Sequence, residues 1–254
     1  MKPLALLLVL CPLWSWASTP ITAEAYIVTN LNGEVLLEHN PDRERPIASI
    51  TKLFVAEQAV KLDQDELLTV TKGDYHTGRM RSTPLRVGHS YKRRQLIELA
   101  LISSDNVAAL TLARTAPPDT RYATLVEGSG LDPANRSTAR QLAEAARELY
   151  LTEVGPRSIE LTAEIGARHS TNPLLEKDGW YFLLSKTGFI NSSGGCLTVV
   201  LRVKSELLTV VILGAANTRQ RWADLIELRR RLGDTDFYVP VKVVKPAAKK
   251  RRHK

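Results

Sequence analysis

The sequence contains little cysteine and no long hydrophobic run outside its first residues. Of the two cysteines, Cys11 lies in an N-terminal segment that we expect to be removed, so only Cys196 remains and no internal disulfide can form. Cys196 begins an apolar run typical of a buried strand, which favours a small core residue over a catalytic thiol. No later stretch approaches the roughly 18 apolar residues of a membrane-spanning helix. A chain of 254 residues with 44% hydrophobic residues can instead bury one sizeable core.

Gly/Ser-rich linkers and internal repeats are absent as well, which predicts one folded domain over residues 18–240. Before this domain, the apolar run Pro3–Trp14 follows a single positive charge and leads to Ser15-Trp16-Ala17. This pattern predicts an export signal, residues 1–17, that is cleaved after Ala17 to leave a mature protein in the periplasm of a Gram-negative type of cell. A buried first strand or helix is the alternative interpretation.

Acidic residues are missing from the last ten positions, which hold six Lys and Arg residues and supply much of the net charge of +8. We predict that residues 241–254 are a disordered basic tail. Such a tail can stay solvated, or it can contact an anionic wall polymer or membrane surface. Nucleic acid is not an expected partner of an exported protein.

Hydrophobic periodicity defines the expected helices and strands. Two strands, 23–29 and 34–38, flank Asn30-Leu31-Asn32-Gly33, and Asn-Gly is a strong hairpin signal. Helices are predicted at 49–62, 92–113, 138–151, 158–167 and 218–232, further strands at 180–186, 196–203 and 207–215, and an extended piece at 237–244. Because both ends of the chain supply strands, we predict an α+β fold with one antiparallel sheet, flanking helices and a helical lobe from the middle of the chain.

Three short motifs follow one another along the chain: Ser49-Ile50-Thr51-Lys52, Ser104-Asp105-Asn106 and Lys186-Thr187-Gly188. Each is unremarkable alone, but all three in this order arise by chance in about one or two chains per hundred. Serine is a poor nucleophile at neutral pH and needs a neighbouring base. Residues three apart share a helix face, so Lys52 can take the Ser49 proton if burial and a second cation, Lys186, lower its pKa. The amide of Ser49, in the first helical turn, can help to form an oxyanion hole.

The other two motifs also interrupt or end apolar segments. Ser104-Asp105-Asn106 lies within an apolar helical run, where polar groups are costly unless they face a site or one another. A helix-to-helix junction capped by Ser or Asp is the alternative. Lys186-Thr187-Gly188 follows a strand, and a lysine at a sheet edge with a glycine behind it suits a strand on which an extended peptide docks.

Together with their flanking segments, these motifs resemble the low-molecular-mass penicillin-binding proteins, serine-type D-Ala-D-Ala carboxypeptidases and endopeptidases. The resemblance covers nearly the whole mature chain and rests on the segments 46–53, 103–109, 130–139 and 186–197. It implies a β-lactamase/transpeptidase-like fold, a peptidoglycan peptide as substrate, β-lactam antibiotics as covalent inhibitors, and no metal or cofactor. The combination is most similar to the D-alanyl-D-alanine endopeptidase branch, which cuts D-Ala–diaminopimelate cross-links.

The resemblance also implies roles for individual residues. Ser49 would be acylated by the penultimate D-Ala carbonyl, with Lys52 as the base and Ser104 as the relay to the leaving amine. The substrate would be held by Asn106, Lys186, Thr187 and Gly188, and the oxyanion by the amides of Ser49 and Phe189. The chain departs from family carboxypeptidases in having only a short basic tail after its sheet, and in Asn191-Ser192-Ser193, which leaves fine specificity open.

Three alternative functions remain. A carboxypeptidase shares all of this chemistry and differs only in trimming a terminal D-Ala. A class A β-lactamase would need a glutamate in a Glu-x-x-Leu-Asn setting between the second and third motifs, and none of the glutamates there has it: Glu127, Glu153, Glu160, Glu164 and Glu176. A non-catalytic wall-binding protein would be expected to lack Ser49 or Lys52, and both are present.

Overall fold

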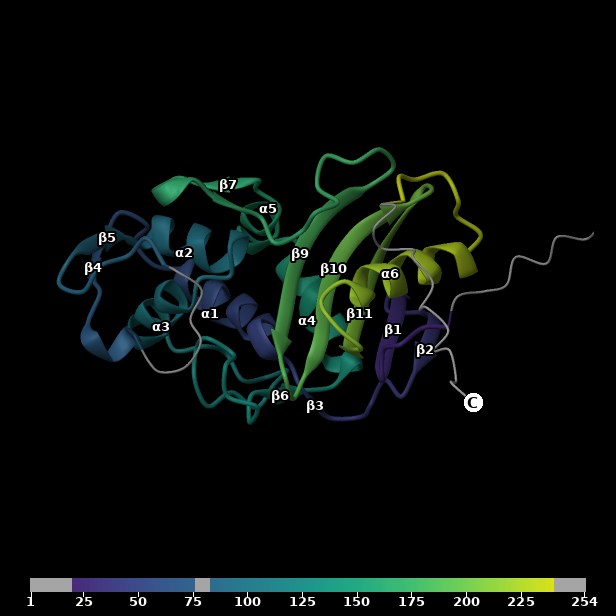
Figure 1. The fold of residues 1–254 in the computed structure, drawn as a ribbon, viewed down its shortest axis with the longest axis horizontal. Helices are drawn as coiled ribbons and strands as arrows, with labels where there is room; N and C mark the ends of the chain where they lie inside the picture. The colour runs from purple at the N-terminus through teal and green to yellow at the C-terminus, as the bar shows by residue number, and fades with distance from the viewer. Residues whose placement is uncertain (1–19, 76–82, 240–254) are drawn as a thin grey trace, which may run out of the picture.

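A five-stranded antiparallel sheet, in the order β2-β1-β11-β10-β9, forms the centre of the fold (Figure 1). The structure is a computed structural model that describes residues 20–75 and 83–239. The predicted export signal and basic tail lie outside the described residues. Among the described residues, no helix combines the length and apolar character needed to span a bilayer.

The sheet is assembled from both ends of the chain. Its first hairpin is β1 (Ala25–Asn30) and β2 (Val35–His39), which confirms the hairpin predicted around Asn32-Gly33. The other three strands are β9 (Tyr181–Ile190), β10 (Gly194–Val203) and β11 (Glu206–Ala215). Strand β1 pairs with β11, with Ala25 opposite Leu213, so the first and last strands lie side by side. This pairing leaves β2 and β9 as the two edges.

Strand β9 is longer than the sequence predicted. It does not stop at Lys186 but continues through the whole third motif to Ile190, and the chain turns at 191–193. The reason lies in the pairing: Lys186, Thr187 and Gly188 are opposite Thr198, Leu197 and Cys196 of β10. Cys196 is a fully buried core residue there, as expected, and burial raises the pKa of its thiol.

Alternate residues of the sheet face two hydrophobic clusters. Helix α6 (Gln220–Arg231) covers one face, where Trp222 and Leu225 pack with Val28 and Ile212. Helix α4 (Ala139–Leu149) covers the other face, in the cluster that holds Ala25, Ile27, Val211 and Leu213. In Figure 1 α6 lies in front of the sheet and α4 behind it. The period-two alternation of β1 and β11 thus accounts for the layered arrangement.

A helical lobe lies beside the β9 edge (Figure 1). Its main helices are α1 (Thr51–Ala59), α2 (Arg93–Ile102), α3 (Asn106–Thr115) and α5 (Val154–Ser158). The 3₁₀ helices and short strands are η1 (Ala48–Ile50), η2 (Lys72–Tyr75), η3 (Ile165–Ala167), β3 (Arg45–Pro46), β4 (Leu67–Thr69), β5 (Ser90–Lys92), β6 (Arg136–Ser137), β7 (Thr162–Ala163) and β8 (Arg168–His169). The predicted helix–sheet order and the lobe from the middle of the chain are both confirmed.

Two predicted elements of the lobe are wrong. The helix expected at 92–113 is two helices, because the chain breaks between Ile102 and Asn106. The helix expected at 158–167 is absent: α5 ends at Ser158, a short β7–β8 pairing follows, and Gly166 has a φ of 72° that no α-helix contains. At the end of the described chain, residues 237–239 are not a strand, and the remainder of the predicted extended piece lies outside the described residues.

Candidate active site

Ser49 and Lys52 lie at the start of the first helix of the lobe. Ser49 is in η1 and Lys52 is in the first turn of α1, so the two side chains share a face. The Lys52 Nζ atom donates hydrogen bonds to Ser49 Oγ at 2.9 Å and to Asn106 Oδ1 at 2.8 Å, and a third to the Ser129 carbonyl. Lys52 is fully buried, whereas Ser49 is partly exposed. The predicted pairing of the two side chains is therefore present.

The backbone just before Ser49 is held in an uncommon conformation. Ala48 has a φ of 48°, a left-handed region that most residues with a side chain avoid. Gly130, with a φ of 80°, lies directly against it, and a Cβ atom at Gly130 would be 2.0 Å from the Ala48 carbonyl oxygen. Only glycine therefore permits this close approach beside the candidate nucleophile.

The second motif occupies the junction between α2 and α3. Ser104 has a φ of 60°, and Asp105 is the N-cap of α3, where its carboxylate accepts from the Ala108 amide at 3.0 Å. Asn106 is the first residue of α3 and reaches Lys52. The capped junction that the sequence offered as an alternative is therefore present, and it also presents Ser104 and Asn106 to the site.

The third motif lies on edge strand β9 and faces the lobe. Lys186 is fully buried, and its Nζ donates to Ser104 Oγ at 2.9 Å. A Cβ atom at Gly188 would lie 3.1 Å from the Ser49 amide nitrogen and 2.9 Å from the Ile47 carbonyl oxygen. Without a side chain at Gly188, β9 can lie close to the backbone of the candidate nucleophile.

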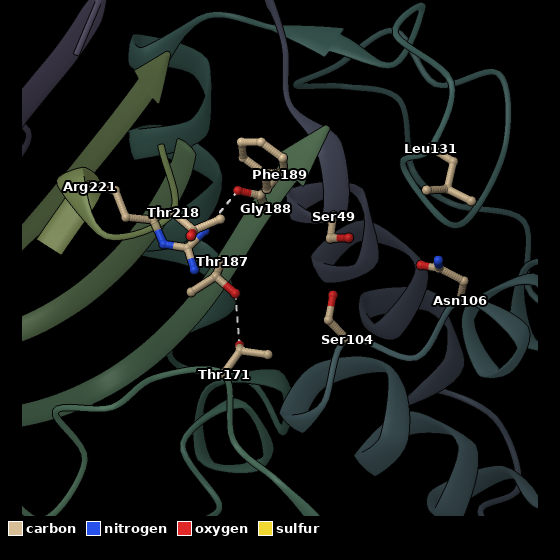
Figure 2. Close-up of a pocket in the computed structure, with 10 residues that line it drawn as sticks. All are labelled: Ser49, Ser104, Asn106, Leu131, Thr171, Thr187, Gly188, Phe189, Thr218 and Arg221. Atoms are coloured by element: carbon tan, nitrogen blue, oxygen red, sulfur yellow. Dashed lines mark hydrogen bonds between the residues drawn. The ribbon is translucent and has the colours of Figure 1, made fainter. Parts of the chain in front are cut away.

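A cavity of about 230 Å³ brings the three motifs together (Figure 2). Figure 2 shows Ser49 and Ser104 in the middle, Asn106 and Leu131 on one side, and Thr187 on the other. Its lining residues are Ser49, Ser104, Asn106, Leu131, Thr171, Thr187, Gly188, Phe189, Thr218 and Arg221. The predicted residues Ser49, Ser104, Asn106, Thr187, Gly188 and Phe189 all line it, while Lys52 and Lys186 reach it through their bonds to the two serines.

The sequence did not predict four of the lining residues: Leu131, Thr171, Thr218 and Arg221. Thr171 Oγ1 is 2.8 Å from Thr187 Oγ1, and Arg221 Nη1 donates to the Gly188 carbonyl at 2.9 Å. Arg221 belongs to α6, which contains several arginines, so nothing in its local sequence separates it from a solvated charge. Arg221 and Lys186 thus bring two basic side chains to the site, and such a site attracts a carboxylate.

Comparison with known proteins accounts for this arrangement. A family model described as D-alanyl-D-alanine carboxypeptidase matches residues 15–121. A D-alanyl-D-alanine endopeptidase of Pseudomonas aeruginosa is 34% identical over 239 residues, which cover 81% of this chain and 76% of that protein. The chain belongs to the low-molecular-mass penicillin-binding proteins.

This penicillin-binding protein has further relatives that agree. A D-alanyl-D-alanine endopeptidase of Escherichia coli K12 is 29% identical over 272 residues, covering 93% of this chain and 85% of that protein. The ampicillin-bound structure of penicillin-binding protein D2 from Listeria monocytogenes matches with a TM-score of 0.72 and 25% identity, covering 85% of this chain and 98% of that one. The family resemblance and the transpeptidase-like fold that the motifs indicated are thereby confirmed, and the chain is a serine D,D-peptidase.

Proposed function

We propose that this serine D,D-peptidase is a D-alanyl-D-alanine endopeptidase that opens the peptide cross-links of peptidoglycan, with Ser49 as its nucleophile. The observation that carries the proposal is the hydrogen bond from buried Lys52 to partly exposed Ser49 at the wall of the cavity. Support for endopeptidase activity comes from the relatives of Pseudomonas aeruginosa and Escherichia coli, both of which carry that name.

Acylation is the first half of the proposed reaction. Ser49 Oγ attacks the carbonyl carbon of the D-Ala residue while its proton passes to the neutral amine of Lys52. The developing oxyanion is stabilised by the backbone amides of Ser49 and Phe189. The short approach of Gly188 to the Ser49 amide supports this step, because it places β9 next to the nucleophile.

Departure of the amine and hydrolysis complete the cycle. Ser104, hydrogen-bonded to Lys186, relays a proton to the leaving nitrogen as the C–N bond breaks. Asn106 holds the substrate amide, and Lys186 and Thr187 bind a carboxylate of the substrate. Water then attacks the acyl-enzyme, which releases the acyl peptide as a free carboxylate and restores the Ser49 hydroxyl.

The nucleophile assignment is tested with fluorescent penicillin. Wild-type protein should become covalently labelled, because a β-lactam presents its amide carbonyl to the same serine. Ser49→Ala should abolish the label while the far-ultraviolet circular dichroism spectrum stays unchanged. Persistent labelling of the Ser49→Ala protein would refute the assignment.

Carboxypeptidase activity is the second candidate, because the matching family model carries that description. Digestion of purified muropeptides separates the two activities. Loss of cross-linked dimers, with pentapeptide monomers left intact, is the result expected of an endopeptidase. Loss of the terminal D-Ala from monomers, with dimers left intact, would replace the proposal by a carboxypeptidase.

The structure also bears on the β-lactamase alternative. None of the described residues that line the cavity is a glutamate or an aspartate. A fast β-lactamase of the class A type needs a carboxylate beside the acyl-enzyme to activate water. We therefore propose that the penicilloyl adduct is long-lived, which intact-mass spectrometry over hours can measure.

The proposed compartment and domain limits follow from the sequence. We propose that the chain is exported, loses residues 1–17 and acts in the periplasm through a domain of residues 18–240. The basic tail, residues 241–254, is proposed to contact anionic wall or membrane surfaces. N-terminal sequencing of protein recovered from the periplasm should begin at Ser18, and any other start would move the cleavage site.

A further inference from the structure

The segment of residues 126–135, here called the Glu127 loop, folds around one carboxylate. Glu127 Oε1 accepts hydrogen bonds from the Gly130 amide, from the Asp132 amide at 3.3 Å and from Asn135 Nδ2 at 3.2 Å. Glu127 Oε2 accepts from the Ser129 amide. Both oxygens of the half-buried carboxylate are thus occupied by N–H groups of its own loop.

The same loop contacts the Ser49–Lys52 pair from several sides. The Ser129 carbonyl accepts a hydrogen bond from Lys52 Nζ, and Gly130 packs on the backbone of Ala48. Its last residue, Asn135, binds on either side of Ser49. Asn135 Nδ2 donates to Thr51 Oγ1 at 3.1 Å, and the Asn135 carbonyl accepts from the Ile47 amide at 3.0 Å.

We propose that Glu127 is a positioning residue of the peptidase, which fixes the loop so that Ser129 holds the Lys52 amine and Gly130 supports the backbone at Ser49. The proposal rests on the role of Lys52 as base in the proposed function. Glu127 acts through the loop and not on the substrate, since it does not line the cavity. Glu127 lies between the second and third motifs, as the deacylating glutamate of a class A β-lactamase does. We assign it the support of the loop and no part in deacylation.

The hydrogen bonds of the loop require a side chain that accepts on both of its terminal atoms. Every bond to Glu127 comes from an N–H donor, and a carboxylate is a side chain with acceptors on both oxygens and no donor. Glutamine has the same shape but would turn an NH₂ group toward a backbone N–H, and would leave at least one buried amide without an acceptor. Glu127→Gln therefore loosens the loop without opening a hole in the core.

Loosening the loop should also change the titration of Lys52. Charged groups face this region from four elements. They are Lys186 on β9, which donates to Ser104, Asp105 next to Asn106 at the start of α3, Arg221 of α6 at the cavity, and Glu127 in the loop. Glu127→Gln removes a negative charge and weakens the Ser129 acceptor, and both changes favour the neutral amine. The acid limb of the acylation rate, which reports formation of neutral Lys52, should move to lower pH.

The test measures the second-order rate constant of acylation by fluorescent penicillin between pH 5 and pH 10. For Glu127→Gln we expect a rate at the optimum about 10- to 100-fold below wild type, because small displacements of catalytic groups have effects of this size. We also expect the acid limb to move down by about half a pH unit or more. The matched control is Asp74→Asn, which removes a buried carboxylate outside the Glu127 loop that accepts from the Thr71 amide and pairs with Arg114 of α3.

Asp74→Asn should lower the midpoint of thermal unfolding and leave the acid limb in place. The positioning role is refuted if Glu127→Gln matches wild type in both rate and pH profile. It is also refuted if the variant acylates more slowly but its acid limb stays in place or moves to higher pH, because a merely structural role predicts that result. Wild-type protein and Ser49→Ala are run in parallel. Failure of the wild type to acylate, or labelling of Ser49→Ala, would count against the proposed function, whereas a normal wild type with an unaffected Glu127→Gln would count against the positioning role alone.

Discussion

Strands β2 and β9 are the two edges of one sheet, yet they differ in almost every property that matters for function. All five residues of β2 are exposed or half-buried. Five consecutive residues of β9, 184–188, are buried, and they include Lys186, Thr187 and Gly188. The helical lobe makes the difference, because it covers β9 and brings Ser49 and Ser104 against it. In the proposed function, an unpaired strand edge thus becomes a substrate site only where a second layer supplies the nucleophile.

Of the edge variants, replacement of Lys186 on β9 should reduce the acylation rate most. Lys186→Ala removes the hydrogen bond to Ser104 and one of the cations of the cavity. We expect the rate constant of penicillin acylation to fall about 10²- to 10³-fold, the range for loss of a group that acts on proton transfer. Lys204→Ala, in the exposed turn between β10 and β11, is the matched control and should acylate normally. If Lys186→Ala acylates at the same rate as the control, the lysine of β9 takes no part in acylation.

The next prediction compares a glycine at each edge. Gly188→Ala places a Cβ atom 2.9 Å from the Ile47 carbonyl and 3.1 Å from the Ser49 amide, so we expect acylation to slow about tenfold or more. Gly33→Ala, in the turn between β1 and β2, meets only the flexible Arg147 side chain but has a φ of 89°. It should cost about 1 kcal/mol of unfolding free energy and leave acylation unchanged. Acylation kinetics and urea unfolding are measured for both variants. Equal changes in acylation rate at Gly188 and Gly33 would contradict the predicted difference between the two edges.

The contrast between the edges was only partly predictable from the sequence. Local patterns sufficed for the β1–β2 hairpin and for the Ser49–Lys52 pair, because both depend on residues a few positions apart. They failed at 158–167, where Gly166 takes a left-handed conformation that apolar spacing does not reveal. They also missed Arg221, whose contact with Gly188 spans 33 positions and depends on how α6 crosses the sheet. The position of Arg221 depends on packing between distant segments, about which hydrophobic periodicity carries no information.

Helix α6 contacts both β9 and the segment just before β1, and the second contact depends on pH. Arg221 reaches β9, whereas Asp224, one turn later, accepts from the Thr22 amide at 3.0 Å and from Thr22 Oγ1 at 2.9 Å, just before β1. Burial raises the pKa of the Asp224 carboxyl. The folded protein therefore keeps this proton where the unfolded chain has lost it. Its contribution to stability is fully present below the ordinary pKa, near 4, and is lost as the pH rises through the raised value.

Asp224→Asn removes this titration. The unfolding free energy of the variant, relative to wild type, should therefore increase as the pH rises from about 4 to about 7. Urea unfolding of both proteins at several pH values measures the difference. If the difference in unfolding free energy does not change with pH, Asp224 titrates alike in the folded and unfolded states. The rate of acylation should fall less in Asp224→Asn than in Gly188→Ala.

The smallest effects are expected from an exposed ring at each edge. Phe189 on β9 is 43% exposed and lines the cavity, whereas His39 on β2 is exposed and stacks on Tyr26 with ring centroids 5.8 Å apart. Phe189→Ala keeps the backbone amide of the proposed oxyanion hole. It should slow acylation about fivefold, the equivalent of about 1 kcal/mol of lost apolar contact with the bound penicillin. His39→Ala should change the unfolding free energy by less than about 0.5 kcal/mol and leave acylation unchanged. Equal acylation rates in the two variants would mean that the Phe189 side chain makes no contact with the bound penicillin. The functional difference between the two edges would then be confined to the backbone of β9 and to the buried residues that the helical lobe covers.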